Sequence, residues 1–298
     1  MKEARFDAWA RQQLSDVEAA LETWVPADAP AGLGLAMRYG VLDGGKRLRP
    51  LLVLATSQAL AGAPDAALRA AVAVELIHAY SLVHDDMPCM DNDVLRRGKP
   101  TVHVKFGQAQ AMLAGDAMQA LAFDVLTPDV GVEPALQARL VALLARAAGA
   151  SGMAGGQAID LASVGRALDE AALRDMHRRK TGALLEASVM MGAACGRPSA
   201  SASTSAALQR YGRAVGLAFQ VVDDILDVTQ ASETLGKTAG KDQESNKPTF
   251  VSVLGLDAAR QHAQALRQQA LAALADSGLG AQAAVLAALA DRVVERES

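Results

Sequence analysis

Cysteine and aromatic residues are scarce in this chain of 298 residues. Its two cysteines, Cys89 and Cys195, cannot hold a fold of this size together, and neither lies in a CxxC or Cys/His metal-binding pattern. Both fit free thiols in a reducing compartment. Aromatic residues make up only 3% of the chain, which argues against the stacking platforms of proteins that bind single-stranded nucleic acid.

An excess of positive charge and long uncharged stretches are also missing. The 29 Lys and Arg residues are outnumbered by 33 Asp and Glu residues, so the net charge is −4, unlike the basic footprint of a general nucleic-acid binder. The first residues are charged and lack the apolar region of a signal peptide, and no stretch of 18 residues is free of charge. We therefore expect a soluble, cytoplasmic protein without a membrane span.

Helix-forming residues are what the chain has in abundance. Apolar residues make up 51% of it, which is enough to bury a core, and Ala, Leu and Gln dominate the long stretches. Alternating β-branched runs are nearly absent, and no repeat or long linker divides the sequence. We predict one all-α domain over residues 1–298, with a polar loop over 230–248. Helices are expected over 3–24, 50–62, 65–87, 102–126, 134–148, 168–180, 182–195, 203–228, 257–275 and 280–295.

The first of two acidic clusters follows the helix expected over 65–87. It contains Asp85, Asp86 and Asp91, and Pro88 interrupts the helix so that Asp91 can fold back toward the pair. At 100° per residue, His78 and Ser81 share a helix face with Asp85. The cluster therefore predicts a carboxylate site at the end of a buried helix.

The second acidic cluster lies within the helix expected over 203–228. Asp223 and Asp227 are four residues apart and Asp224 and Asp227 three apart, so both pairs lie on adjacent positions of one helix face. Two carboxylates 4 Å apart repel by about 4 kcal/mol at an effective dielectric constant near 20. A divalent cation would convert this repulsion into binding energy. Oxygen ligands without His or Cys companions favour Mg²⁺, which commonly shares its coordination shell with substrate phosphates.

Groups of cations accompany both acidic clusters. Any one group could be a solvated helix face, but cations beside paired carboxylates favour an anion bridged by metal, with Arg and Lys as phosphate ligands. The groups are Lys46, Arg47 and Arg49; Arg96, Arg97 and Lys99; Arg178, Arg179 and Lys180; and Lys237, Lys241 and Lys247.

At these residues the chain resembles the trans-isoprenyl diphosphate synthases, and most of all the bacterial farnesyl diphosphate synthases. The matching motifs occur in order from about residue 40 to 255. They are GGKRLRP at 44–50, DDxxxxD at 85–91, LRRGKP at 95–100, KTG at 180–182, FQ at 219–220, DDxxD at 223–227 and GK at 236–237.

The resemblance implies an isoprenoid synthase-type helical bundle around a deep central cavity. It implies a prenyltransferase in which Mg²⁺ ions, bridged by an allylic diphosphate, promote loss of diphosphate, and isopentenyl diphosphate attacks the allylic cation. The starter would be dimethylallyl or geranyl diphosphate and the product farnesyl diphosphate, joined head to tail. It also implies a homodimer, and symmetric pairs are the commonest oligomers.

The resemblance also assigns roles to individual residues. Metal would be held by Asp85, Asp86, Asp91, Asp223 and Asp227. Isopentenyl diphosphate would be bound by Lys46, Arg49, His78 and Arg97, and the allylic diphosphate by Arg96, Lys180, Lys237 and Lys247. Thr181 and Gln220 would face the developing cation, and the residues expected to carry the catalysis are Asp85, Asp91, Lys180, Thr181, Gln220, Asp223 and Lys237.

Product length should follow the depth of the cavity below Asp85, since one helical turn rises about 5.4 Å, comparable to one isoprene unit. In farnesyl-type members an aromatic residue five positions before the first aspartate forms the cavity floor, which here is Tyr80, with Ser81 beside it. This favours a C15 product. The alternative is that Tyr80 only packs in the core and that length is set elsewhere.

Other functions remain open on the sequence alone. A geranylgeranyl diphosphate synthase would use the same chemistry for a C20 product. A terpene cyclase would leave Lys46, Arg49 and His78 idle, and a phosphohydrolase built on His84 and Asp85 would need more His ligands than the chain offers. A non-catalytic partner subunit would be expected to lose a carboxylate, and neither motif has lost one. The chain also ends in residues 295–298 without the basic C-terminus common in close relatives, which argues against a C-terminal contribution to isopentenyl diphosphate binding.

Overall fold

Helices make up nearly all of the regular structure, as the sequence predicts. The computed structural model describes residues 3–296, except for residues 43, 167, 198 and 230–247. The strands in these described ranges are β1 and β2, an antiparallel hairpin of two residues each. The elements are α1 (Glu3–Trp24), η1 (Pro30–Gly32), α2 (Leu33–Val41), α3 (Leu48–Ala59), α4 (Pro64–Asp85), β1 (Leu95–Arg96), β2 (Lys99–Pro100), α5 (Val102–Phe106), α6 (Gln108–Leu126), α7 (Pro134–Ala148), α8 (Met153–Ala162), α9 (Glu170–His177), η2 (Arg178–Gly182), α10 (Ala183–Ala194), α11 (Ala202–Thr229), α14 (Phe250–Leu254), α15 (Leu256–Asp276), η3 (Gly280–Ala283) and α16 (Ala284–Val294).

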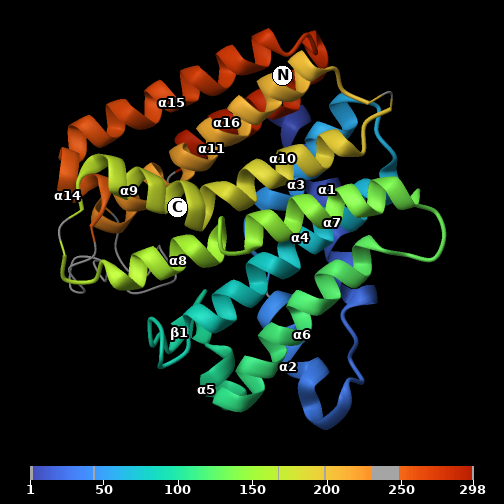
Figure 1. Cartoon of the computed structure of the whole chain (residues 1–298), viewed down its shortest axis with the longest axis vertical. Helices are drawn as coiled ribbons and strands as arrows, with labels where there is room; N and C mark the ends of the chain where they lie inside the picture. Colours follow the sequence, from blue (N-terminus) through green and yellow to red (C-terminus); the bar gives the residue numbers. More distant parts are fainter. Residues whose placement is uncertain (1–2, 43, 167, 198, 230–247, 297–298) are drawn as a thin grey trace.

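The helices pack in two adjoining groups. In one, α4 packs against α3 and α6; in the other, α11 packs against α10 and α15 (Figure 1). Helices α3 and α10 belong to both groups, because alternate side chains such as Val53 and Leu52, or Leu184 and Leu185, enter different hydrophobic clusters. The two clusters therefore meet along α3 and α10, beside the helices that carry the acidic motifs.

Helix α4 is apolar on nearly all sides. By length and composition it could cross a membrane, yet 67% of that window is buried inside the protein, where the helix contacts α3, α6 and α10. A helix that is apolar all round is typical of a protein core. Its role is therefore to carry His78, Tyr80 and Asp85 through the interior.

Several helix boundaries differ from the prediction because glycines and tertiary contacts set them. The helix predicted over 102–126 is interrupted at Gly107, whose φ of +89° favours glycine. The helices predicted over 168–180 and 182–195 are continuous through η2, which is a single π-helical turn. Helices α2, α8 and α14 were not predicted, and α8 contains the adjacent glycines 155 and 156, which disfavour helix by propensity alone.

Arg47, one of the cations in the predicted phosphate-binding group, is a structural residue instead. Its guanidinium is buried and pairs with Glu75 at 2.6 Å and with Glu18 at 2.7 Å, and it also donates to the carbonyl of Val41 at 2.5 Å. These contacts fasten the start of α3 to α1 and α4. They hold the neighbouring Lys46 and Arg49 in place.

Arg47→Leu should lower the free energy of unfolding by about 3–5 kcal/mol, because it leaves Glu75 buried without its partner. Chemical denaturation monitored by circular dichroism measures the change. Arg174→Leu is the matched control, since the Arg174–Glu170 pair lies exposed on one helix and should contribute under about 1 kcal/mol. Equal losses in the two variants would contradict the structural role of Arg47.

Candidate active site

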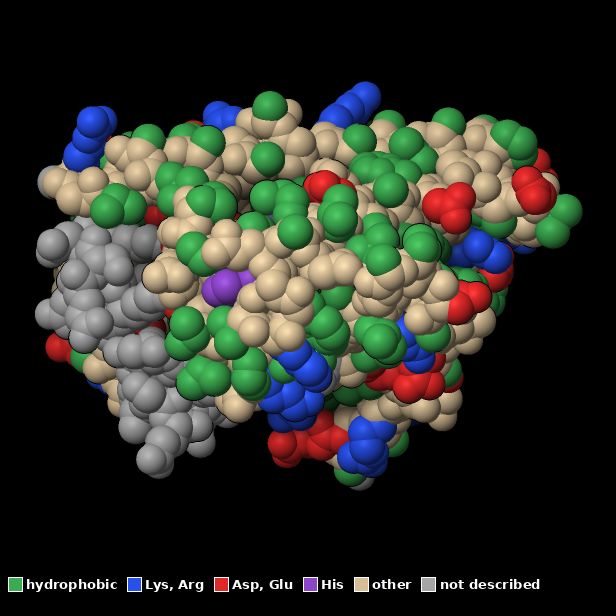
Figure 2. All heavy atoms as spheres, turned by 90° about the horizontal axis from the view of Figure 1, so that it is seen from below, with side chains coloured by type: hydrophobic (Ala, Val, Ile, Leu, Met, Phe, Trp, Pro, Cys, Tyr) green, Lys and Arg blue, Asp and Glu red, His purple; other side chains and the backbone are tan. Residues whose placement is uncertain are grey.

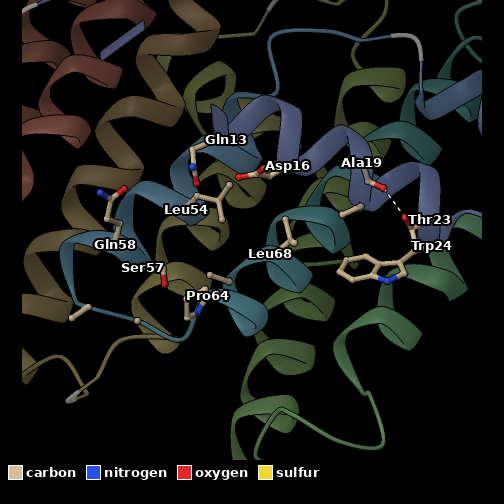
Figure 3. Close-up of a pocket in the computed structure, with 14 residues that line it drawn as sticks. Gln13, Asp16, Ala19, Thr23, Trp24, Leu54, Ser57, Gln58, Pro64 and Leu68 are labelled. Carbon is tan, nitrogen blue, oxygen red and sulfur yellow. Dashed lines mark hydrogen bonds between the residues drawn. The ribbon is translucent and has the colours of Figure 1, made fainter. Parts of the chain in front are cut away.

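Two of the cavities in the described part of the chain are large enough to consider. The larger, about 790 Å³, lies between α1, α3 and α4, as Figure 3 shows. Asp16 is the one ionisable residue in the lining of this cavity, so the cavity offers no pair of ionisable groups for catalysis. The smaller, about 360 Å³, is lined by His78, Asp85, Lys180 and Thr181 among others. Seven of the predicted site residues line the smaller cavity: Arg49, His78, Tyr80, Ser81, Asp85, Lys180 and Thr181.

The first acidic motif lies at the C-terminal end of α4, next to this cavity. The turn at Pro88 brings Asp91 back, and its backbone N–H donates to the carbonyl of Asp85 at 2.8 Å. Burial raises the pKa of Asp85 to about 6; Lys180 opposes this shift and Asp91 adds to it. The predicted fold-back is confirmed, and a cation could bind beside Asp85 and Asp91 where the carboxylates repel.

Asp86 lies on a different side of this turn. It is only 2% exposed and accepts two hydrogen bonds from Arg96, from Nε at 2.8 Å and from Nη2 at 2.6 Å. Arg96 comes from the β1–β2 hairpin, so the pair anchors the hairpin to the end of α4. The predicted roles of Asp86 at metal and of Arg96 at diphosphate stay predictions, and either would require this pair to share its bonds.

The π-helical turn η2 places Lys180 and Thr181 between α8 and α11. A Cβ atom at Gly156 of α8 would clash with the backbone of Lys180, and one at Gly216 of α11 would lie 3.0 Å from Gly182. Glycine at these positions therefore lets three backbones approach closely. π-helical turns are rare and often occur at functional sites. Lys180 Nζ lies 2.5 Å from Asp160 of α8, which the sequence analysis did not assign to the site.

The second acidic motif on α11 reaches the cavity through hydrogen bonds. Thr181 donates to Gln220 at 3.0 Å, and Gln220 Nε2 donates to Asp224 at 2.8 Å. Asp227, one turn further along, is buried. The structure thus brings the predicted cation-facing residues into one chain of contacts.

The predicted isopentenyl-diphosphate residues also lie close together. Arg49 and His78 both line the cavity. Burial and Arg49 hold the pKa of His78 well below its usual value, so the ring is neutral near pH 7 and can donate one hydrogen bond. Burial and Arg296 lower the pKa of Lys46, while Asp223 raises it. Arg97 donates to the carbonyl of Gly44, which joins the hairpin to the glycine turn.

Arg296 was not predicted as a site residue, although it is the last cation of the chain. Its guanidinium lies 2.5 Å from Asp223 Oδ1, donates to the carbonyl of Phe219 at 2.7 Å and stacks 4.1 Å above the Phe219 ring. The side chain is 8% exposed. The C-terminal segment thus supplies a cation to the second acidic motif, a contact that was not predicted. A single Arg in an acidic tail gave no signal for this.

Gln157 is not among the residues predicted for the site. It lines the cavity from α8, it is buried, and neither its amide nitrogen nor its amide oxygen has a hydrogen-bond partner among the residues that the structure describes. Buried amides are normally satisfied, so this one is available to a ligand. Three other predicted cations, Lys237, Lys241 and Lys247, lie outside the described residues, as does the predicted polar loop up to residue 247.

The carboxylates fit Mg²⁺ as part of a shared site. In the described ranges no three His, Cys, Asp or Glu side chains converge into a complete metal site. Asp85 with Asp91, and Asp223 with Asp227, offer oxygen donors only, the ligands that Mg²⁺ prefers. Each pair would leave coordination positions for the oxygens of a diphosphate.

Comparison with known proteins identifies the family of this chain. The polyprenyl synthetase family profile matches residues 31–285. Farnesyl diphosphate synthase of Escherichia coli is 47% identical over 267 residues, covering 87% of this chain and 88% of that protein. A chloroplastic geranylgeranyl pyrophosphate synthase of Catharanthus roseus is 44% identical over 295 residues, covering 98% and 82%.

A solved structure shows the same fold. The geranyltransferase of Helicobacter pylori, in complex with magnesium and isoprenyl diphosphate, superposes with a TM-score of 0.87 at 34% identity and covers 97% of each chain. Its fold and the family profile agree. The chain therefore belongs to the polyprenyl synthetase family and is a prenyltransferase.

Proposed function

We propose that the enzyme is a farnesyl diphosphate synthase, which adds isopentenyl diphosphate to dimethylallyl and then to geranyl diphosphate. Residues 1–298 would act as one catalytic domain. The observation that carries the C15 assignment is the cavity below Asp85, which Tyr80 lines little more than one helical turn away. A C20 product is the second candidate, because relatives of both kinds have similar identity to this chain.

The predicted site residues would bind either metal or diphosphate. Mg²⁺, when bound, would neutralise the negative charge of the departing diphosphate. Asp85, Asp91, Asp223 and Asp227 would hold it, with Asp86 as the further predicted ligand. The cations would position the two diphosphates: Lys46, Arg49, Arg97 and neutral His78 on isopentenyl diphosphate, and Arg96, Lys180, Lys237 and Lys247 on the allylic one.

The bond changes follow from this arrangement. The allylic C1–O bond breaks, C4 of isopentenyl diphosphate forms the new bond to C1, and a proton leaves C2 to the released diphosphate. The oxygens of Thr181 and Gln220 would face the positive charge as it develops. The apolar wall of the cavity would exclude water from that cation.

The requirement for the second substrate tests the reaction class. Diphosphate release from geranyl diphosphate is measured with Mg²⁺, in the presence and absence of isopentenyl diphosphate. Release that depends on isopentenyl diphosphate is expected. Equal release without it would indicate a cyclase or a phosphohydrolase and would overturn the proposal.

Arg296→Gln should lower the Mg²⁺ concentration needed for half-maximal activity by roughly 3- to 10-fold, because it frees Asp223 from a charged hydrogen bond. Arg292→Gln is the matched control, since Arg292 forms a 2.9 Å ion pair with Asp7, which is not a site residue. An unchanged Mg²⁺ dependence, with a raised KM for isopentenyl diphosphate, would show that Arg296 serves the substrate instead.

We further propose that the enzyme is a cytoplasmic homodimer. Exposed hydrophobic side chains gather at the end of the molecule formed by α2, α5 and α6, namely Leu35, Val104, Met112 and Leu113. Figure 2 shows hydrophobic side chains spread over the middle of the face seen from this end. Sedimentation velocity should give a mass of twice the chain; a monomer at micromolar concentration would contradict the dimer.

A further inference from the structure

Asp224, the middle aspartate of the second acidic motif, is held by protein donors on both of its oxygens. It is 3% exposed. Its Oδ1 accepts from Nε2 of Gln220 at 2.8 Å, and its Oδ2 accepts from the backbone N–H of Phe250 at 2.7 Å. The carboxylate therefore joins α11 to the start of α14. It also contacts Gln220 directly, one of the residues expected to face the developing cation.

The neighbouring aspartate has different surroundings. Asp223 is partly exposed and contacts Arg296, a side chain near the end of the chain. Asp224 points about 100° around the helix from Asp223, into the protein. A metal ion at Asp224 would have to displace a buried backbone N–H, whose loss of a partner is costly.

The contact with Asp224 fixes the orientation of the Gln220 amide. Both Asp224 oxygens accept hydrogen bonds, so the NH₂ end of the amide faces Asp224. The carbonyl end must then face Thr181, whose hydroxyl donates to it at 3.0 Å. The negative charge also polarises the amide and makes its oxygen a better partner for positive charge.

His177 lies near Asp224 but does not form a hydrogen bond with it. Its ring stacks on Phe250 at 5.4 Å and lies 4.0 Å from Asp224 Oδ2, beyond hydrogen-bond distance. Burial lowers the pKa of His177 to about 4, so the ring is neutral and brings no positive charge to the carboxylate. Gln220 and Phe250 thus remain the donors seen on Asp224 among the described residues.

We propose that Asp224 is a positioning residue that orients Gln220, and through it Thr181, toward the developing allylic cation, and that it is not a metal ligand. This inference rests on the proposed condensation for the role of the two oxygens. It assigns different tasks to adjacent carboxylates of one motif: Asp223 and Asp227 face the diphosphate, and Asp224 sets the geometry of the residues facing the hydrocarbon.

A double-mutant cycle tests the proposal. Asp224→Asn places an NH₂ group against the donors of Gln220 or Phe250, and kcat should fall roughly 10-fold or more with little change in the KM of either substrate. In a Gln220→Met background, the same substitution should change kcat less than about 2-fold, because the residue through which Asp224 acts is gone. Equal effects in both backgrounds would overturn the proposal.

Metal binding supplies a readout that does not depend on turnover. Mn²⁺ binding in the presence of inorganic diphosphate is measured by calorimetry. Asp224→Asn should leave the affinity within about 2-fold of wild type, whereas the matched variant Asp223→Asn should weaken it roughly 10-fold. A similar loss in Asp224→Asn would show that Asp224 is a metal ligand.

Hydrogen exchange at the Phe250 amide tests the hydrogen bond from this amide to Asp224. Its amide should exchange faster in Asp224→Asn than in wild type, and at the wild-type rate in Gln220→Met. Asp224→Ser is the second variant, with the same expected results, for use if the Asn variant does not fold. A wild-type enzyme without condensation activity would refute the proposed function, while the Mn²⁺ and exchange measurements still judge Asp224.

Discussion

Asp85→Ala should lower turnover roughly 10³-fold or more while the protein stays folded, because Asp85 and Asp91 form one of the two carboxylate pairs expected to hold the metal. The burial that raises the pKa of Asp85 also makes its environment one in which a bound cation has large effects. Steady-state kinetics with isopentenyl and geranyl diphosphate measure the loss. Asp116→Asn, on the exposed side of α6, is the control and should keep normal turnover.

The pH dependence of stability provides an independent check on Asp85. Burial raises the pKa of Asp85 from 3.8 to about 6, so between about pH 4 and pH 6 this carboxyl binds more protons in the folded protein than in the unfolded one. In the metal-free protein the Asp85 contribution to the free energy of unfolding should therefore fall by about 3 kcal/mol as pH rises through this window. It is measured as the difference between wild type and Asp85→Asn, because the lowered pKa values of His78 and His177 act in the opposite direction in both proteins. Asp85→Asn should remove this fall and be more stable than wild type at pH 7. Near-normal turnover of Asp85→Ala, or a less stable Asp85→Asn, would contradict this description of the site.

Tyr80→Ala should lengthen the product from C15 to C20 or beyond. The Tyr80 side chain is 9% exposed, lines the cavity and packs edge-on against His84 at 5.7 Å. Its removal opens space on the side of the cavity away from Asp85, where a growing chain would extend. Radiolabelled products, dephosphorylated and sized by chromatography, give the distribution.

Tyr80→Phe is the matched control for this prediction. It removes only the hydroxyl, whose contact with Gln119 Nε2 is long at 3.4 Å, and keeps the ring that limits the cavity. The product should stay at C15. Unchanged C15 output from Tyr80→Ala would show that Tyr80 only packs in the core and that other residues set the length.

Local features of the fold followed from the sequence because local chemistry determines them. The turn at Pro88 returned Asp91 to Asp85, and the 100° rotation per residue brought His78, Ser81 and Asp85 to one cavity. The long helices at 3–24 and 134–148 had the predicted limits, since proline and periodicity fix both ends.

Partners distant in sequence decided the rest. In the sequence of residues 46–49, Arg47 looks like the neighbouring cations. Its structural role is visible only in the folded protein, where it pairs with Glu18 and Glu75. Likewise, the pairing of Asp86 with Arg96, and of Asp223 with Arg296, depends on how the hairpin and the C-terminus pack. Helix propensity could not predict α8 or the π-helical turn, because close packing at glycines sets them.

The size of the condensation product tests the central claim most directly. The purified protein is incubated with labelled isopentenyl diphosphate, dimethylallyl diphosphate and Mg²⁺, and the products are dephosphorylated and sized. A C15 alcohol that disappears when EDTA removes the metal is the predicted result. A C20 or longer alcohol would contradict the role of Tyr80 as the cavity floor, and no condensation product at all would contradict the proposed function.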